Sequence, residues 1–383
     1  MNSRERVQMA LNHKEPDRVP FDLGGSVLTS IHVQAYRRLR RYLGLADIEP
    51  RISDIFQQIV QVDDDVLDRL GVDVKNVAPR SSATFQIDIR DMGEYTYFYD
   101  EFKIGWRMPK DGGLYYDMFD HPLSGNITAE DIDRFPWPNP LDPSRFVGLR
   151  EAAVRVANEE GRAVLMGNMC AGVLEVTAWM RGFADYYADL AGNQKLIGHL
   201  MDKVLELKLA YWAKALELVG DIVDVVQDAD DFAGQFGMLI SPQTYRALVK
   251  PRHKELFDFI HQRTRAKVFF HSCGSIRSVI PDLIEVGVDI LNPVQVSAAG
   301  MDSAELKREF GKDLVFWGGG VDTQNVLGAG TPDDVRAEVR RRLDDLMPGG
   351  GFVFATVHNI QANVPPENIV ALWETVQEHG LYR

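Results

Sequence analysis

The stretch from Lys267 to Ser275 reads KVFFHSCGS, an apolar run that ends abruptly in a histidine, a cysteine and a glycine. This pattern predicts a buried strand over 267–271 that enters a loop. His271 and Cys273 then lie at the C-terminal end of the strand, where residues two apart can point the same way. An imidazole and a thiolate directed at one point provide half of a zinc site. The alternative is a small buried cysteine beside a hydrogen-bonded loop histidine.

Around this stretch, helical and strand patterns alternate along most of the chain. Helices are predicted at 3–13, 31–43, 53–70, 145–160, 172–219, 243–264, 275–286, 302–310, 332–346 and 366–379. Strands are predicted at 17–23, 72–77, 163–168, 222–228, 267–271, 288–293, 314–319 and 351–355. Eight mostly apolar strands with intervening helices indicate an α/β fold of the (β/α)8 TIM-barrel type.

One segment interrupts this alternation. Between about 81 and 145 the pattern changes to short strands at 96–99, 104–108 and 113–118, with an Asp-Gly hairpin signal at 111–112. The sequence FPWPNP at 135–140 closes the segment as a stiff connector. We therefore predict one barrel domain over 1–383 with an antiparallel β insertion at about 81–145, after the second barrel unit. Trp106 within it is a candidate wall of a substrate pocket, and packing inside the insertion is the alternative.

The overall charge limits the classes of partner. The chain has 42 Lys and Arg against 56 Asp and Glu, a formal charge of -14, which disfavours nucleic acid or an anionic membrane as a partner. Two cysteines in 383 residues are too few for a disulfide framework. The N-terminus lacks the apolar region of a signal peptide, and no segment approaches the roughly 18 apolar residues of a membrane span. We expect a cytoplasmic protein.

Polar side chains follow most of the predicted strands. Active sites of TIM barrels lie at the C-terminal ends of the strands. Each such residue taken alone is more readily a helix cap or a turn residue, but together they predict a polar pocket. The residues expected to contact substrate are Asn168, Asp228, Asp230, Gln295, Trp106 and Trp317.

A second histidine, His358, follows the last predicted strand. It is far from Cys273 in the sequence, and a barrel can bring the two together across its mouth. His271, Cys273 and His358 would then supply three nitrogen and sulfur ligands and leave a fourth tetrahedral position open, as in catalytic zinc sites. The alternative is that His358 hydrogen-bonds substrate without touching metal.

These motifs resemble the uroporphyrinogen decarboxylase superfamily over nearly the whole chain. Within it, the His-x-Cys at 271–273 is similar to the first two zinc ligands of the zinc-dependent corrinoid methyltransferases, the methylcobamide:coenzyme M methyltransferases. In that branch a third ligand, a cysteine, comes shortly before a Pro-x-Glu-Asn stretch. The corresponding stretch here is NVPPENI at 363–369, and His358 stands where the cysteine is expected.

The chain also departs from the true decarboxylases of the superfamily. Their arginine-containing N-terminal signature is replaced by FDLGGS at 21–26, and their catalytic aspartate by VAPR at 77–80. They too carry a late histidine that binds substrate, so His358 does not separate the two branches. Few basic residues lie at the predicted strand ends to bind the carboxylates of a porphyrinogen.

The resemblance implies a zinc-dependent methyltransferase that works with a corrinoid (cobalamin). The chain lacks the corrinoid-binding Asp-x-His-x-x-Gly signature, so a separate corrinoid protein would supply the corrinoid in trans. The other substrate would be a small O-, N- or S-methyl compound or a thiol acceptor. The chain could also serve as a component of an O-demethylase. Two alternatives remain: a metal-free decarboxylase that uses His358 and an Asp of 228–231 as acid and base, and a non-catalytic barrel in which Trp106 and Trp317 stack on a tetrapyrrole or corrinoid. A homodimer is left open.

Overall fold

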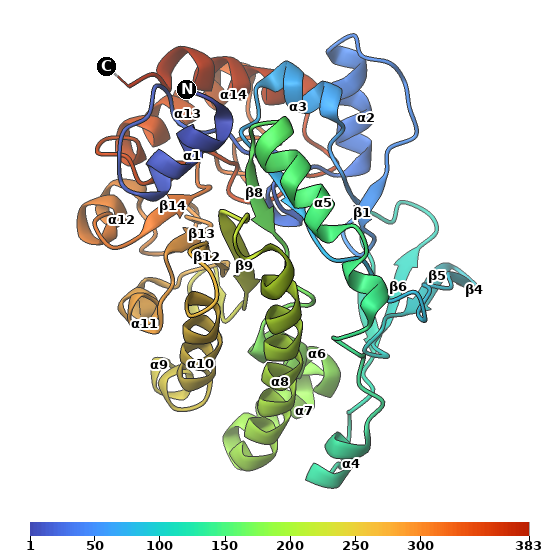
Figure 1. Cartoon of the computed structure of the whole chain (residues 1–383). Coiled ribbons are helices and arrows are strands. Elements are labelled where there is room, and N and C mark those ends of the chain that lie inside the picture. Colours follow the sequence, from blue (N-terminus) through green and yellow to red (C-terminus); the bar gives the residue numbers. More distant parts are fainter. Residues whose placement is uncertain (383) are drawn as a thin grey trace.

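A curved parallel sheet surrounded by helices forms the centre of the molecule (Figure 1). The computed structural model describes residues 1–382. Seven strands lie in the order β15-β14-β13-β12-β9-β8-β3, so neighbours in the sheet are also consecutive barrel units along the chain. These strands are β3 (Val74–Val77), β8 (Ala163–Met166), β9 (Val225–Ala229), β12 (Lys267–His271), β13 (Ile290–Asn292), β14 (Val315–Trp317) and β15 (Phe352–Val353).

The first predicted strand occupies the gap between β15 and β3. Phe21 forms a parallel bridge with Phe354. The Asp22 backbone N–H donates to the Phe354 carbonyl at 2.8 Å, and the Asp73 N–H donates to the Phe21 carbonyl at 2.8 Å. The segment around Phe21 therefore takes the position of an eighth strand, although only single bridges mark it. The prediction of a TIM-type α/β barrel is confirmed.

Successive side chains of each strand point alternately into the barrel and toward the surrounding helices, so the molecule has an inner and an outer core. Phe269 and Trp317 pack inside the barrel together with Val7 of the N-terminal helix, whereas Phe270 packs outward against the surrounding helices. This alternation follows from the pleat of a strand. The helices are α1 (Ser3–Leu11), α2 (Val33–Tyr42), α3 (Asp64–Leu70), α4 (Ala129–Arg134), α5 (Leu149–Val154), α6 (Val173–Arg181), α7 (Phe183–Gly192), α8 (Gln194–Val219), α9 (Pro242–Thr244), α10 (Lys250–His261), α11 (Ile280–Val286), α12 (Ser303–Phe310), α13 (Pro332–Leu346) and α14 (Pro366–His379).

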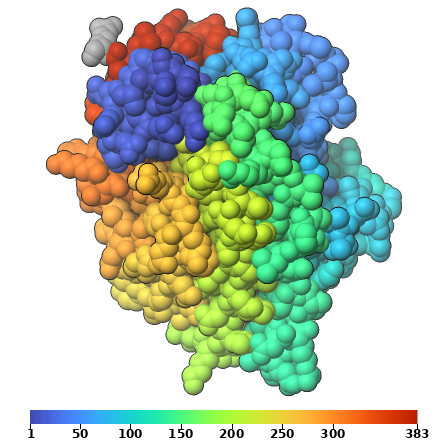
Figure 2. Space-filling model, viewed as in Figure 1, coloured from blue at the N-terminus to red at the C-terminus, as the bar shows by residue number. Residues whose placement is uncertain are grey.

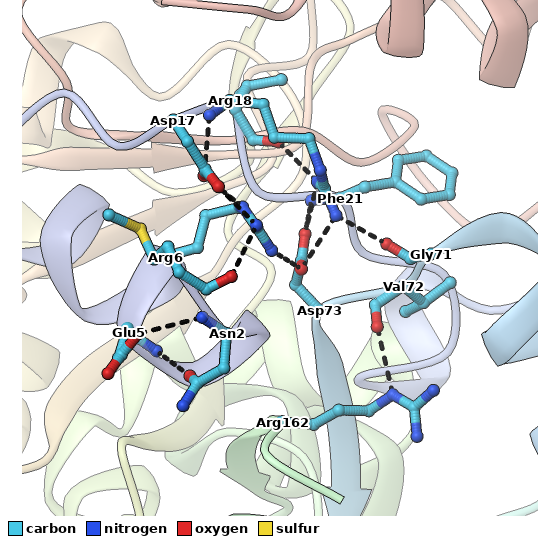
Figure 3. Close-up of polar contacts among 12 residues, drawn as sticks. Asn2, Glu5, Arg6, Asp17, Arg18, Phe21, Gly71, Val72, Asp73 and Arg162 are labelled. Atoms are coloured by element: carbon cyan, nitrogen blue, oxygen red, sulfur yellow. Dashed lines mark hydrogen bonds and ion pairs between the residues drawn. The ribbon is translucent and has the colours of Figure 1, made fainter.

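A buried carboxylate ties the N-terminal end of the barrel together (Figure 3). Asp73 is fully buried, and it accepts hydrogen bonds from Arg6 Nη1 and Arg18 Nη1, each at 2.7 Å, and from the Phe21 N–H at 2.8 Å. These contacts join α1, the first strand position and β3. The two ends of the chain also lie side by side here (Figure 2), where the Val19 N–H donates to the Gly380 carbonyl at 2.7 Å.

The insertion forms a four-stranded antiparallel sheet of β4 (Arg90–Met92), β5 (Tyr95–Tyr99), β6 (Gly105–Pro109) and β7 (Asp117–Asp120). The predicted strands at 96–99 and 104–108 correspond to β5 and β6, whereas the one predicted at 113–118 begins too early and overlaps β7 only at 117–118. The sequence analysis did not predict β4. The sheet lies at the side of the barrel (Figure 1).

The predicted helix over 53–70 is wrong in its first half. There, β1 (Ile52–Asp54) pairs with β2 (Ile59–Val60), and only Asp64–Leu70 is helical. The β-branched residues at 52, 59 and 60 favour a strand, and the Gln57 N–H donates to Asp54 Oδ1 at 2.7 Å in the turn between them. Within residues 1–382, no helix combines the length and the apolar character that a membrane span needs.

Candidate metal centre and pocket

His271 ends β12 with its ring directed into the barrel and only 3% of its surface exposed. Its Nδ1 lies 2.5 Å from Asn292 Oδ1, and Asn292 Nδ2 donates to the Trp317 carbonyl at 2.7 Å. Because the Asn292 amide nitrogen is already a donor, its oxygen must accept from His271. The hydrogen of the neutral imidazole is thereby placed on Nδ1, and Nε2 keeps a free lone pair.

Cys273 lies beside that lone pair, with Sγ 3.4 Å from His271 Nε2. The Cys273 N–H donates to Asp231 Oδ1 at 2.6 Å, which fixes the loop after β12. Burial raises the pKa of the Cys273 thiol well above its usual value, and the nearby carboxylates of Asp231 and Glu175 raise it further. The electrostatic potential at the Cys273 sulfur is therefore negative.

Gly274 allows this loop to approach a hairpin formed by β10 (Ala233–Gly234) and β11 (Gly237–Met238). Its φ is +90°, and a Cβ atom would stand 2.7 Å from the carbonyl atoms of Ala233 and Gly234. No side chain fits there without moving the backbone. The Ser275 N–H also donates to the Gly234 carbonyl at 2.9 Å, so the loop at 272–275 and the hairpin form one packed unit.

His358 reaches the same point from the segment after β15. Its ring centre lies 5.5 Å from that of His271, at an interplanar angle of 67°. One ligand atom from each of His271, Cys273 and His358 lies within 4.8 Å of the other two. Burial and the adjacent His271 lower the pKa of His358 to about 4, so its imidazole is neutral at pH 7.

A cavity of about 540 Å³ opens beside Cys273 and His358. Within residues 1–382, no lysine, arginine, aspartate or glutamate lines it; its polar groups are mainly amides. The lining residues are Ala233, Gly234, Gln235, Cys273, Gly274, Gln295, Thr323, Gln324, Val357, His358 and Gln361.

Gln295 is the predicted substrate-contacting residue that lines this cavity. Its Oε1 accepts from the Gly274 N–H at 2.6 Å, and its Nε2 donates to Gln235 Oε1 at 2.9 Å. The sequence analysis missed Gln235, although the glycines at 234 and 237 are a hairpin signal that could have located it. It also missed Glu175 as a neighbour of Cys273.

Asp228 and Asp230 face away from the cavity, toward the helices. Asp228 Oδ1 forms a buried ion pair with Lys208 Nζ at 2.8 Å. The Asp230 carboxylate is fully buried and accepts from the Leu174 and Glu175 N–H groups at the start of α6 and from His253 Nε2. Neither aspartate lines this cavity, because strand residues alternate between faces, and their contact with a substrate stays a prediction.

The other predicted substrate contacts also lie outside the cavity lining. Trp317 is fully buried inside the barrel and donates from Nε1 to Asp22 Oδ2 at 2.8 Å. Trp106 packs between the insertion and the rest of the chain, with its ring centre 4.5 Å from that of Phe56 and 5.8 Å from that of Trp179, and it donates to Asp100. Asn168 is half-buried after β8 and does not line the cavity.

Comparison with known families gives one family match. The family profile described as uroporphyrinogen decarboxylase (URO-D) matches residues 118–379. The chain is 27% identical over 276 residues to a uroporphyrinogen decarboxylase of Alkalilimnicola ehrlichii, covering 68% of each protein. It is 23% identical over 217 residues to the methylcobamide:CoM methyltransferase MtbA of Methanosarcina mazei, covering 56% of this chain and 59% of MtbA.

Among solved structures, a methyltransferase from Methanosarcina mazei is similar over 99% of both chains. The TM-score is 0.66 and the sequence identity is 18%. At this identity, the likeness supports the barrel fold.

Proposed function

The chain belongs to the uroporphyrinogen decarboxylase family, and we propose that within this family it is a zinc-dependent methyltransferase. It would move a methyl group between a small methylated substrate or thiol and a corrinoid held by a separate protein. The observation that carries this proposal is the convergence of ligand atoms from His271, Cys273 and His358 within 4.8 Å. The similarity to the methylcobamide:CoM methyltransferase MtbA supports it.

The three side chains fit a zinc ion in chemistry and spacing. Two imidazole nitrogens and one thiolate are ligands that zinc prefers. A tetrahedral zinc ion with bonds of about 2.0 Å to nitrogen and 2.3 Å to sulfur separates the nitrogen and sulfur ligand atoms by roughly 3.5 Å. The separation of 3.4 Å between His271 Nε2 and Cys273 Sγ is close to this value. Three protein ligands leave a fourth position for substrate, as in catalytic sites.

The chain's own residues would orient the reactants. Asn292 holds the His271 ring so that Nε2 points toward Cys273. The amides of Gln295, Gln324 and Gln361 line the cavity and can hydrogen-bond a small polar substrate. When bound, zinc supplies Lewis-acid chemistry, which lowers the pKa of a thiol or makes the heteroatom that bears the methyl group a better leaving group. An O-demethylase would use the second effect, which makes the oxygen that bears the methyl group a better leaving group.

The rival function is a metal-free decarboxylase, because several relatives are named uroporphyrinogen decarboxylase. Carboxylate-rich porphyrinogens need cationic partners. Within residues 1–382, no lysine or arginine lines the cavity beside His358. The lining therefore favours a smaller and less anionic substrate. A non-catalytic corrinoid-binding barrel is the third candidate, and an activity assay distinguishes it from both enzymes.

The decisive experiment is metal analysis of the purified chain and of matched cysteine variants. We expect about one zinc ion per chain, and we expect Cys273→Ala and His358→Ala to lose it. Cys170→Ala is the control, because Cys170 is the only other cysteine of the chain and is not in the ligand group. Thermal unfolding checks that each variant is folded.

Two results would contradict the proposal. If the folded wild-type protein contains no zinc, the chain is not a zinc enzyme. If His358→Ala keeps its zinc, His358 is not a ligand. Methyl transfer from methylcobalamin to a simple alkyl thiol, followed by the change in corrinoid absorbance, tests the activity. Zinc binding without transfer above the Cys273→Ala background would favour the non-catalytic candidate.

A further inference from the structure

A second crevice, of about 380 Å³, has a charge unlike that of the rest of the molecule. It lies between the loop after the first strand, the end of β3, and α5, and it shares no lining residue with the cavity at the candidate metal centre. Five basic side chains and no carboxylate line it, although acidic residues outnumber basic ones in the whole chain, 56 to 42. The basic residues are Arg51, Lys75, Arg80, Arg145 and Arg155.

Two of these cations are neutralised from behind the crevice wall. Lys75 Nζ lies 2.5 Å from Asp64 Oδ1 and 2.8 Å from Glu160 Oε2. Arg145 is buried and forms an ion pair with Glu101. Their donors are therefore directed largely at protein carboxylates rather than at the crevice.

Arg51 and Arg80 remain without a carboxylate partner among residues 1–382. Both side chains are exposed, and Arg51 Nη1 contacts Gln61 Oε1 at 3.3 Å. Arg80 Nη2 stands 3.8 Å from the point where a Cβ atom of Gly148 would be, which is ordinary van der Waals distance and places this guanidinium beside the start of α5. Arg155 makes only a long contact, 3.3 Å, to Glu160.

We propose that this crevice binds a phosphate monoester with a small apolar body. A phosphate monoester carries a charge of about -1.5 to -2 at pH 7, which the two unpaired guanidinium groups would balance. The planar guanidinium fork matches phosphate oxygens in a bidentate way.

The rest of the crevice suits the organic part of such a ligand. Val27, Val147 and Ala152 keep part of their surface exposed and supply apolar lining, above the buried Val62, Leu67, Val77, Leu149 and Val156. The volume lies within the range of about 300–1,000 Å³ that is usual for small-molecule sites. The apolar lining predicts that a phosphate ester binds more tightly than inorganic phosphate, because it buries additional apolar surface.

The test is calorimetric titration of the full-length protein with phenyl phosphate. We expect saturable binding with one site per chain, and about tenfold or greater weakening in Arg51→Ala and in Arg80→Ala, because each removes a charged hydrogen-bonding fork. Arg340→Ala is the matched control, since Arg340 is an exposed arginine of α13 away from the crevice. Affinity should also fall as salt concentration rises.

Titrations with phenol and with inorganic phosphate separate the two parts of the ligand. Both should bind more weakly than phenyl phosphate. The proposal is overturned if phenyl phosphate shows no saturable binding at millimolar concentration, if both arginine variants bind it as wild type does, or if phenol binds equally well. Thermal unfolding of each variant shows whether a loss of binding reflects a loss of fold.

Discussion

At the scale of single residues, Asn292 determines how His271 presents its ring. Its side chain is buried and bridges His271 Nδ1 and the Trp317 carbonyl. We predict that Asn292→Ala weakens zinc binding by about 10- to 100-fold, the usual cost of losing the partner that orients a ligand histidine. Competition against a chromophoric chelator measures this affinity.

The control for this prediction is Asn12→Ala, which removes an exposed side chain that bonds only the Gln8 carbonyl near the end of α1. Its zinc affinity should equal that of wild type. If Asn292→Ala also binds zinc normally, then packing alone holds the His271 ring, or the ring is not a ligand.

The sequence predicted three candidate ligands that the structure brings together, whereas the two predicted aspartates do not line the cavity beside them. Histidine and cysteine after an apolar strand suggest metal chemistry directly through their residue types. Asp228 and Asp230 could not be assigned to a face, because both faces of a parallel barrel strand are apolar. In β9, Val225 packs inside the barrel and Val226 outside, and hydropathy does not distinguish them.

At the scale of elements, the loop at 272–275, which carries Cys273, packs closely against the β10–β11 hairpin. We predict that Gly274→Ala lowers the free energy of unfolding by more than the roughly 1–2 kcal/mol of a left-handed alanine. The added Cβ meets hairpin backbone at 2.7 Å, and backbone cannot move aside as a flexible side chain does. Urea unfolding followed by circular dichroism measures the change.

Gly44→Ala separates the two contributions. Gly44 has a φ of +70°, and a Cβ there meets no atom within 4 Å. This variant should therefore show the backbone strain alone. Equal losses of stability in the two variants would mean that the loop and the hairpin can separate at little cost.

Helix boundaries were predictable where capping residues mark them. The predicted helices at 332–346 and 366–379 coincide with α13 and α14. A capping box between Thr331 and Asp334 begins α13, and prolines stand at the start of both helices. The helix expected over 53–70 failed in its first half because short strand pairs carry too few residues to show their period.

At the scale of the whole molecule, the repeated alternation of strand and helix in the sequence predicts the barrel. It does not predict the pairings that close the barrel between its first and last strands. The first strand is represented only by bridges from Arg18 to Leu381 and from Phe21 to Phe354. Such long-range pairings join residues at opposite ends of the chain, and no local pattern encodes them. The candidate metal centre has the same dependence, because β12 and the segment after β15 meet only in the closed barrel.

A buried carboxylate at this closure makes stability depend on pH. Asp22 is 2% exposed, and it accepts from the Gly25 N–H at 2.7 Å and from Trp317 Nε1 at 2.8 Å. Burial raises the pKa of Asp22 to about 6, above the value of about 4 for an unfolded chain. The folded state therefore binds this proton more tightly than the unfolded state does.

The sign of the effect follows from that difference. The stabilisation by the bound proton is complete below about pH 4 and is lost as the pH rises to about 6, a change of up to about 3 kcal/mol. Asp22→Asn cannot titrate, so the stability of the variant relative to wild type should increase as the pH rises from 4 to 7. Urea unfolding at several pH values measures this difference.

Asp313→Asn, which changes an exposed carboxylate, serves as the control. Its free energy of unfolding should change with pH in parallel with that of wild type. A parallel curve for Asp22→Asn would mean that Asp22 titrates normally in the folded barrel.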